Sequence, residues 1–111
     1  PAENQTLNQG QKADRYRLSV LFVLEKAERW YKVKVTSSKK KRRLEFGEDT
    51  VSGGYKFTIY KAGSKKVFKT IKVTQEASGK MVTLPKKKGT YYFKISKLTK
   101  KTNGVYEIGY Y

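Results

Sequence analysis

Apolar side chains recur at every second position along most of this chain, and this period constrains the fold more than any other feature. Tyr31, Val33 and Val35, for example, alternate with Lys32 and Lys34. Successive residues of a β-strand point to opposite faces, whereas an amphipathic helix repeats its apolar residues every three to four positions. The pattern therefore predicts strands that each have one buried face and one solvated face.

The same alternation appears in about eight segments, separated by turn residues such as Gly53-Gly54, Ala62-Gly63-Ser64 and Asn103-Gly104. The apolar positions of these segments are, in order, Tyr16, Leu18, Val20, Phe22 and Leu24; Tyr31, Val33 and Val35; Leu44 and Phe46; Tyr55, Phe57 and Ile59; Val67, Ile71 and Val73; Val82 and Leu84; Tyr91, Phe93 and Ile95; and Tyr106, Ile108 and Tyr110. Short strands at this spacing predict an all-β fold, an antiparallel, jelly-roll-like β-sandwich. Only residues 18–29 also allow a helical turn.

The length of the chain suits one domain, because 111 residues leave little room for two separate cores. Residues 1–14 are polar, with Leu7 as the only sizeable apolar side chain, and are interpreted as an extended leader or linker. Residues 15–111 are predicted to form a single sandwich domain. No apolar run reaches the roughly 18–20 residues that a membrane-spanning helix needs, so no transmembrane segment is expected.

Side chains that commonly carry catalysis are scarce in this chain. It has no histidine and no cysteine, which removes the commonest general base, the commonest metal ligand and all thiol chemistry. Its nine acidic residues are scattered, and none of them occupies an inward-facing apolar position of the predicted strands. Glu48 and Asp49, after Gly47, are interpreted as solvated loop acids rather than as a calcium site. We therefore expect no enzymatic activity, no metal and no cofactor.

Aromatic residues and glycine turns recur together in four motifs, which are Glu28-Arg29-Trp30-Tyr31-Lys32-Val33, Gly53-Gly54-Tyr55-Lys56-Phe57-Thr58-Ile59-Tyr60, Lys88-Gly89-Thr90-Tyr91-Tyr92-Phe93-Lys94-Ile95 and Asn103-Gly104-Val105-Tyr106-Glu107-Ile108. With these motifs, residues 15–111 resemble the bacterial pre-peptidase C-terminal domain, which is similar to the collagen-binding domains of clostridial collagenases. The resemblance implies a non-catalytic β-sandwich attached to a larger protein, exported to the surface or exterior of a bacterial cell. Calcium-binding members place several acids in the N-terminal linker, where this chain has only Glu3 and Asp14. Neither calcium nor collagen binding is expected.

Positive charge dominates the polar residues, since 26 Lys and Arg stand against 9 Asp and Glu for a formal net charge of +17. Such a charge attracts polyanions and opposes self-association, so a monomer is expected. The charges concentrate in four clusters at predicted turns, which are Lys39, Lys40, Lys41, Arg42 and Arg43; Lys65 and Lys66; Lys86, Lys87 and Lys88; and Lys100 and Lys101. We interpret these clusters as a candidate polyanion patch. A solvated surface that only maintains solubility is the equal alternative.

Aromatic side chains form a second candidate site. Tyr60, Phe68, Tyr92 and Tyr111 fall on the strand face opposite the main apolar set. Tyr60 and Tyr92 form the candidate aromatic platform, where exposed rings would stack on sugars or unpaired bases, but burial of these rings under loops or at the sandwich edges is the favoured interpretation. Trp30 is expected in the core, because sandwiches commonly bury one large ring between their sheets.

Three kinds of function remain open on this basis. The leading hypothesis is an extracellular accessory or adhesion module that docks on anionic polymers or polysaccharide surfaces. The alternatives are a nucleic-acid-binding β-barrel of the OB or cold-shock type and a purely structural domain. Nucleic acid is the less favoured partner, because an OB fold has about five strands and because lysine gives looser recognition than arginine.

Overall fold

The structure is a computed structural model that describes residues 4–7, 18–23, 28–77 and 79–111. In these residues the chain forms nine strands and one short 3-10 turn. The strands are β1 (Asn4–Leu7), β2 (Leu18–Val23), β3 (Glu28–Val35), β4 (Arg43–Ser52), β5 (Gly54–Tyr60), β6 (Val67–Thr74), β7 (Lys80–Thr83), β8 (Gly89–Lys97) and β9 (Asn103–Tyr110), and the turn η1 (Gln75–Ala77) follows β6.

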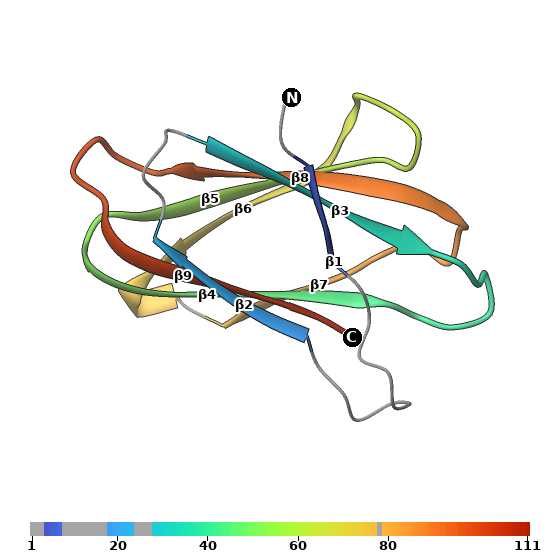
Figure 1. The fold of residues 1–111 in the computed structure, drawn as a ribbon, viewed down its shortest axis with the longest axis horizontal. Coiled ribbons are helices and arrows are strands. Elements are labelled where there is room, and N and C mark those ends of the chain that lie inside the picture. Colours follow the sequence, from blue (N-terminus) through green and yellow to red (C-terminus); the bar gives the residue numbers. More distant parts are fainter. Residues whose placement is uncertain (1–3, 8–17, 24–27, 78) are drawn as a thin grey trace.

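The strands are arranged in two sheets, one above the other in the view of Figure 1. The five-stranded sheet has the order β1-β3-β8-β5-β6, and the four-stranded sheet has the order β2-β9-β4-β7. All neighbouring strands run antiparallel except β1, which pairs in parallel with β3. The predicted all-β sandwich is therefore confirmed. Within the described ranges, no helix is long and apolar enough to cross a membrane.

One strand was not expected from the alternation. β1 lies within the segment that was interpreted as a leader, and it pairs through Asn4 and Leu7 with Trp30 and Val33 at the edge of the five-stranded sheet. A four-residue edge strand is held by backbone hydrogen bonds along one side, so it needs no alternating apolar residues. Residues 18–23 form a strand rather than a helical turn, and residues 24–27 lie outside the described residues.

The core contains the inward side chains of both sheets, with many aromatic rings among them. Fully buried residues include Tyr31 and Phe93 from the five-stranded sheet and Phe46 and Tyr106 from the four-stranded sheet. Phe46 contacts Phe57 with ring centroids 4.3 Å apart, which joins the two sheets at their centre. Every predicted apolar position from residue 31 onward is buried except Val67. Alternation therefore identified the core face of these strands correctly.

Three tyrosine hydroxyls inside this core have hydrogen-bond partners on the opposite sheet. The hydroxyl oxygens of Tyr31 and Tyr106 lie 2.6 Å apart and share a hydrogen bond. The hydroxyl of Tyr55 donates to the carbonyl oxygen of Gly104 at 2.6 Å. A buried hydroxyl that has a partner avoids most of the penalty of leaving water. These bonds connect strands of opposite sheets, so they also fix how the sheets sit on each other.

The exception at Val67 has a local cause in β6. The pairing of β5 and β6 shifts between Ile59 and Tyr60, so that Ile59 pairs with Lys69 while Tyr60 pairs with Val67. The extra residue is Phe68, and such a bulge turns the residues beyond it to the other face. Val67 is therefore 50% exposed, whereas Phe68 is partly buried against the core. The prediction placed these two side chains on the wrong faces.

Gly47, Glu48 and Asp49 were expected in a loop, but they lie inside β4. These residues pair with β9, where Gly47 lies opposite Glu107 and Asp49 lies opposite Val105. The error arose because Gly47 and Asp49 are both residue types that are common in turns. Pairing with β9 keeps the segment extended despite this local preference.

Candidate functional site

Three of the four basic clusters lie at one end of the sandwich. In the five-stranded sheet, Val35 pairs with Gly89 and Ile59 pairs with Phe93, so the segments after β3 and β5 lie beside the segment before β8. The amide of Leu84 donates to the carbonyl of Arg42 at 2.8 Å, which holds the β3–β4 and β7–β8 loops together. In Figure 1 these loops form the right-hand end and the adjacent upper right of the molecule.

We call this region the basic end, and it consists of Lys39, Lys40, Lys41, Arg42, Arg43, Lys65, Lys66, Lys86, Lys87 and Lys88. All of these residues are exposed except Arg42, which is half-buried. The three loops that carry most of them, residues 36–42, 61–66 and 84–88, contain no Asp or Glu. These loops therefore gather positive charges without an acidic side chain of their own, which favours a positive potential at this end.

The fourth cluster lies elsewhere. Lys100 and Lys101 occupy the β8–β9 loop at the opposite end, on the left of Figure 1. The Oγ1 of Thr102 donates to the carbonyl of Gly54 at 2.9 Å, and Ser52 donates to the carbonyl of Lys101 at 2.8 Å. These bonds tie the loop to the end of β4 and the start of β5. Lys100 and Lys101 therefore cannot share a ligand contact with the basic end unless the ligand spans the molecule.

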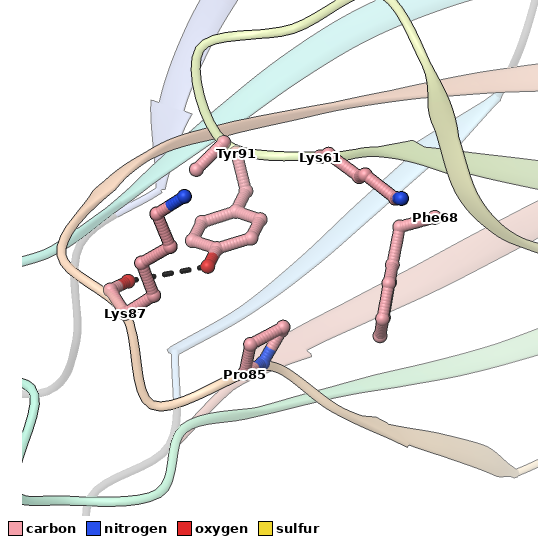
Figure 2. A pocket seen from close by; sticks show the side chains of 6 residues that line it. Lys61, Phe68, Pro85, Lys87 and Tyr91 are labelled. Carbon is pink, nitrogen blue, oxygen red and sulfur yellow. Dashed lines mark hydrogen bonds between the residues drawn. The ribbon is translucent and has the colours of Figure 1, made fainter.

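A hollow of about 220 Å³ opens within the basic end, between the β5–β6 turn and the β7–β8 loop (Figure 2). Its lining residues are Lys61, Ala62, Phe68, Pro85, Lys87 and Tyr91. The Tyr91 hydroxyl donates to the carbonyl of Lys87 at 3.1 Å, which holds the β7–β8 loop against β8. The hollow thus combines an apolar floor with two lysine side chains at its margins.

The bulge at Phe68 helps to create this hollow, because it brings an aromatic ring under the loops instead of leaving it on the outer face. Gly89 lets the β5–β6 turn approach β8 closely, since an added Cβ there would lie only 2.8 Å from the Cβ of Ala62. Sequence reasoning missed the hollow. The signals that would have indicated it are Phe68 and Pro85 beside lysine clusters, but the bulge that joins them is not visible in a pattern.

The predicted aromatic platform lies on a different surface. Tyr60 and Tyr92 are half-buried on the outer face of the five-stranded sheet, which is the face that points away from the other sheet. Trp30 lies there as well, half-buried rather than in the core, and its ring stacks on Tyr60. The expectation for Trp30 was wrong because Tyr31, Val33 and Val35 already occupy the inward positions of β3. The alternation itself would have placed Trp30 outward.

The last two outward candidates, Phe68 and Tyr111, take no part in this platform. Phe68 packs against the core, as described above. Tyr111 donates from its hydroxyl to Glu45 Oε1 at 2.9 Å, and its ring lies under the guanidinium of Arg43 at 6.0 Å. Tyr111 therefore contacts Arg43, which belongs to the basic end, and not the aromatic platform.

These surfaces can bind a partner through positive charges and through contacts with aromatic rings. Among the described residues, no group of three or more Asp, Glu, His or Cys side chains is placed to hold a metal ion. The groups with clearly raised pKa values are tyrosines such as Tyr31, Tyr106 and Tyr110, and burial is the main cause in each. These three hydroxyls lie in the core, whereas Tyr91, whose pKa is also raised by burial, lines the hollow.

Comparison with known proteins supports the fold and not a specific ligand. No family model matches the sequence, and a search of curated proteins finds no relative. Among solved structures, the pre-peptidase C-terminal domain of a collagenase from Bacillus anthracis has a TM-score of 0.68, with 13% identity over 100% of this chain and 97% of that chain. CorA, a surface-associated copper-binding protein of Methylomicrobium album BG8, has a TM-score of 0.53 and 7% identity over 97% and 98% of the two chains. The chain therefore has the fold of a pre-peptidase C-terminal domain, as its aromatic and glycine motifs indicated.

Proposed function

We propose that this chain is a non-catalytic binding module of an exported protein and that it docks on anionic polymers through the basic end. The observation that carries the proposal is the meeting of three lysine-rich loops at one end of the sandwich, without an acidic residue in any of them. A positive surface of this kind attracts a polyanion from a distance and gains affinity as condensed counterions are released.

The fold supports the accessory role in this proposal. The solved structure with the TM-score of 0.68 is itself one domain of a collagenase, and it matches this chain from end to end. The surface location of the copper-binding neighbour supports the proposal that the parent protein is exported. Copper binding is not carried over, because this chain has neither histidine nor cysteine and has a single methionine.

The barrel alternative is excluded by the two-sheet architecture, since OB and cold-shock folds are single barrels of about five strands. A purely structural domain remains the alternative that an experiment must separate from the proposal. In that case the lysines would serve solubility, and no polyanion would bind even at low salt.

The test compares two variants that each remove two exposed lysines from a loop. Lys86→Gln with Lys88→Gln changes the basic end, and Lys100→Gln with Lys101→Gln changes the opposite end, so the loss of net charge is the same. Binding to polyphosphate is measured by titration at about 50 and 200 mM salt, a range over which several phosphate contacts change affinity by orders of magnitude.

The proposal predicts that the first variant binds more weakly and has a shallower salt dependence than the wild type, while the second stays close to the wild type. Equal weakening in both variants would show that only net charge matters and would remove the basic end as a site. Absence of binding in the wild-type protein at low salt would support the structural alternative.

A further inference from the structure

The outer face of the five-stranded sheet carries rings and positive charges in one continuous array. In the register of the sheet, Trp30 on β3 lies opposite Lys94 on β8, and Tyr92 on β8 lies opposite Lys32 on β3. Lys94 in turn lies opposite Thr58 on β5. Because side chains at paired positions share a face, rings and lysines alternate across neighbouring strands.

The aromatic part of this face is preorganised. The rings of Trp30 and Tyr60 are stacked with centroids 5.4 Å apart and an angle of 21° between their planes. The indole Nε1 donates to Glu28 Oε1 at 3.3 Å, and the ammonium of Lys94 lies 5.7 Å from the indole centroid. These contacts hold the indole in one orientation before any ligand arrives, which reduces the entropy lost on binding.

The charges on the same face are only slightly neutralised. Lys94 pairs with Glu28 at 3.7 Å, and Glu28 is the one acidic residue in the described parts of β3, β5, β6 and β8. Lys56 lies directly opposite Lys72 in the β5–β6 pair. Like charges at paired positions of a sheet are destabilising, and a bound anion would relieve that repulsion.

Hydroxyl groups occupy positions between the rings and lysines. Thr70 is exposed, Thr90 and Ser96 are partly exposed, and the two tyrosines of the platform add their phenolic groups. A hydroxyl both donates and accepts hydrogen bonds, so it is suited to partners that are also rich in hydroxyls. The negative face of an aromatic ring attracts the slightly positive C–H groups of a sugar ring.

We infer that the outer face of the five-stranded sheet is a binding surface for acidic polysaccharides, that is, chains of sugar rings that carry carboxylate or sulfate groups. Trp30, Tyr60 and Tyr92 contact the sugar rings, and Lys32, Lys56 and Lys94 contact the acidic groups. This inference rests on the proposed function, which it deepens by naming the class of polymer and a second surface for it.

Single-stranded nucleic acid is the competing class, since bases also stack on rings and phosphates also attract lysines. The described outward positions of these strands favour the sugar polymer. The outward positions of β3, β5, β6 and β8 carry no Arg, Asn or Gln, which are the side chains that commonly recognise base edges, whereas they carry several hydroxyls; the edge strand β1 adds only Asn4, opposite Trp30. Nucleic acid is therefore an outcome of the test rather than the proposal.

Trp30 is the single tryptophan of the chain, so its fluorescence reports on this face alone. The wild type, Tyr60→Ala and Lys94→Gln are titrated with polygalacturonate, heparin, polyphosphate and single-stranded DNA. Met81→Ala is the matched control, because Met81 is an exposed side chain on β7 of the other sheet. Before its affinity is compared, each variant must show the far-UV circular dichroism spectrum of the wild type and must unfold cooperatively.

The expected result is a change in Trp30 emission with polygalacturonate or heparin and no change with polyphosphate. Tyr60→Ala should weaken polysaccharide binding roughly tenfold, which is the scale expected for loss of one stacking ring. Its affinity for polyphosphate should stay at the wild-type value, and Met81→Ala should bind every ligand as the wild type does. Because polygalacturonate carries carboxylates alone and heparin carries sulfates in addition to carboxylates, a response to heparin alone identifies sulfate as the acidic group that is recognised.

Two outcomes would overturn the inference. If polysaccharides bind without changing Trp30 emission, and if Tyr60→Ala binds them as tightly as the wild type does, the outer face is not the site. The proposal for the basic end is not affected by that result. If single-stranded DNA changes the emission at lower concentration than either polysaccharide, the class of ligand is wrong. If polyphosphate binds in none of these titrations, the proposed function of the basic end fails independently of the fluorescence result.

Discussion

The rings of Trp30 and Tyr60 stack with their centroids 5.4 Å apart even though β8 separates the two strands that carry them. The indole therefore crosses one strand of the sheet to reach its partner. This contact covers part of the outer face with aromatic surface and fixes the position of the single tryptophan, whose emission can be followed separately from that of the tyrosines. Several consequences of this contact and of the core beneath it can be measured.

Replacing Tyr60 by alanine should expose the Trp30 indole to water in the free protein. We expect the emission of Trp30 to shift to longer wavelength and the free energy of unfolding to fall by about 0.5–1.5 kcal/mol, the usual worth of an aromatic pair. Fluorescence and urea unfolding measure both effects. Tyr92→Ala is the control, because Tyr92 also lies half-buried on the outer face. An equal spectral shift in both variants would contradict the specific contact with Tyr60.

The hydroxyl pair of Tyr31 and Tyr106 should behave as a coupled unit across the two sheets. Each single change to phenylalanine leaves a buried hydroxyl with one partner fewer and should cost about 1–3 kcal/mol of stability. The double variant removes both hydroxyls, so its loss should be clearly smaller than the sum of the two single losses. A double-mutant cycle from denaturant unfolding measures the difference. Strict additivity would mean that the 2.6 Å contact contributes nothing to stability.

The same pair predicts how stability depends on alkaline pH. Burial raises the pKa of Tyr31 and of Tyr106 in the folded protein above the ordinary value of 10.0. Above a pH of about 10 the unfolded chain loses protons that the folded chain keeps, so the free energy of unfolding falls as pH rises. Below that pH both states are protonated, and this contribution is fully present.

Denaturant unfolding at about pH 8 and about pH 11 tests this pH dependence. Lysine deprotonation also changes the charge repulsion over that range, but it does so equally in the variant. The decrease for wild-type protein should exceed the decrease for the Tyr31→Phe, Tyr106→Phe double variant. Identical decreases in the two proteins would show that these hydroxyls do not control the alkaline limit.

Gly104 should tolerate no side chain. Its φ of 138° is unfavourable for other residues, and an added Cβ would overlap the carbonyl oxygen of Asp49 on β4. Because that obstacle is backbone, we expect Gly104→Ala to cost more than the roughly 1 kcal/mol of an ordinary glycine substitution. Gly63→Ala is the control, since Gly63 also has a positive φ but nothing lies within 4 Å of the added Cβ. Thermal unfolding compares the two, and a larger loss at Gly63 would contradict the packing argument.

The core of this protein could be predicted from its sequence because burial in a sheet follows the period of two. Tyr55, Phe57 and Ile59 illustrate this, since all three are buried and Lys56 between them is not. The same rule, applied without the assumption that sandwiches bury their largest ring, would have placed Trp30 on the outer face. The positions of the basic clusters in loops were also predictable, because lysine runs and turn residues interrupt the alternation.

The relationships between different strands could be determined only from the tertiary structure. Strand order brings Lys39, Lys65 and Lys86 to one end and leaves Lys100 at the other, and this order depends on long-range pairings that no local pattern encodes. The bulge beside Tyr60 decides that Phe68 turns inward and Val67 outward, because one extra residue reverses the alternation. Alternation acts along a single strand, whereas the basic end, the hollow and the Trp30–Tyr60 contact arise where different strands meet.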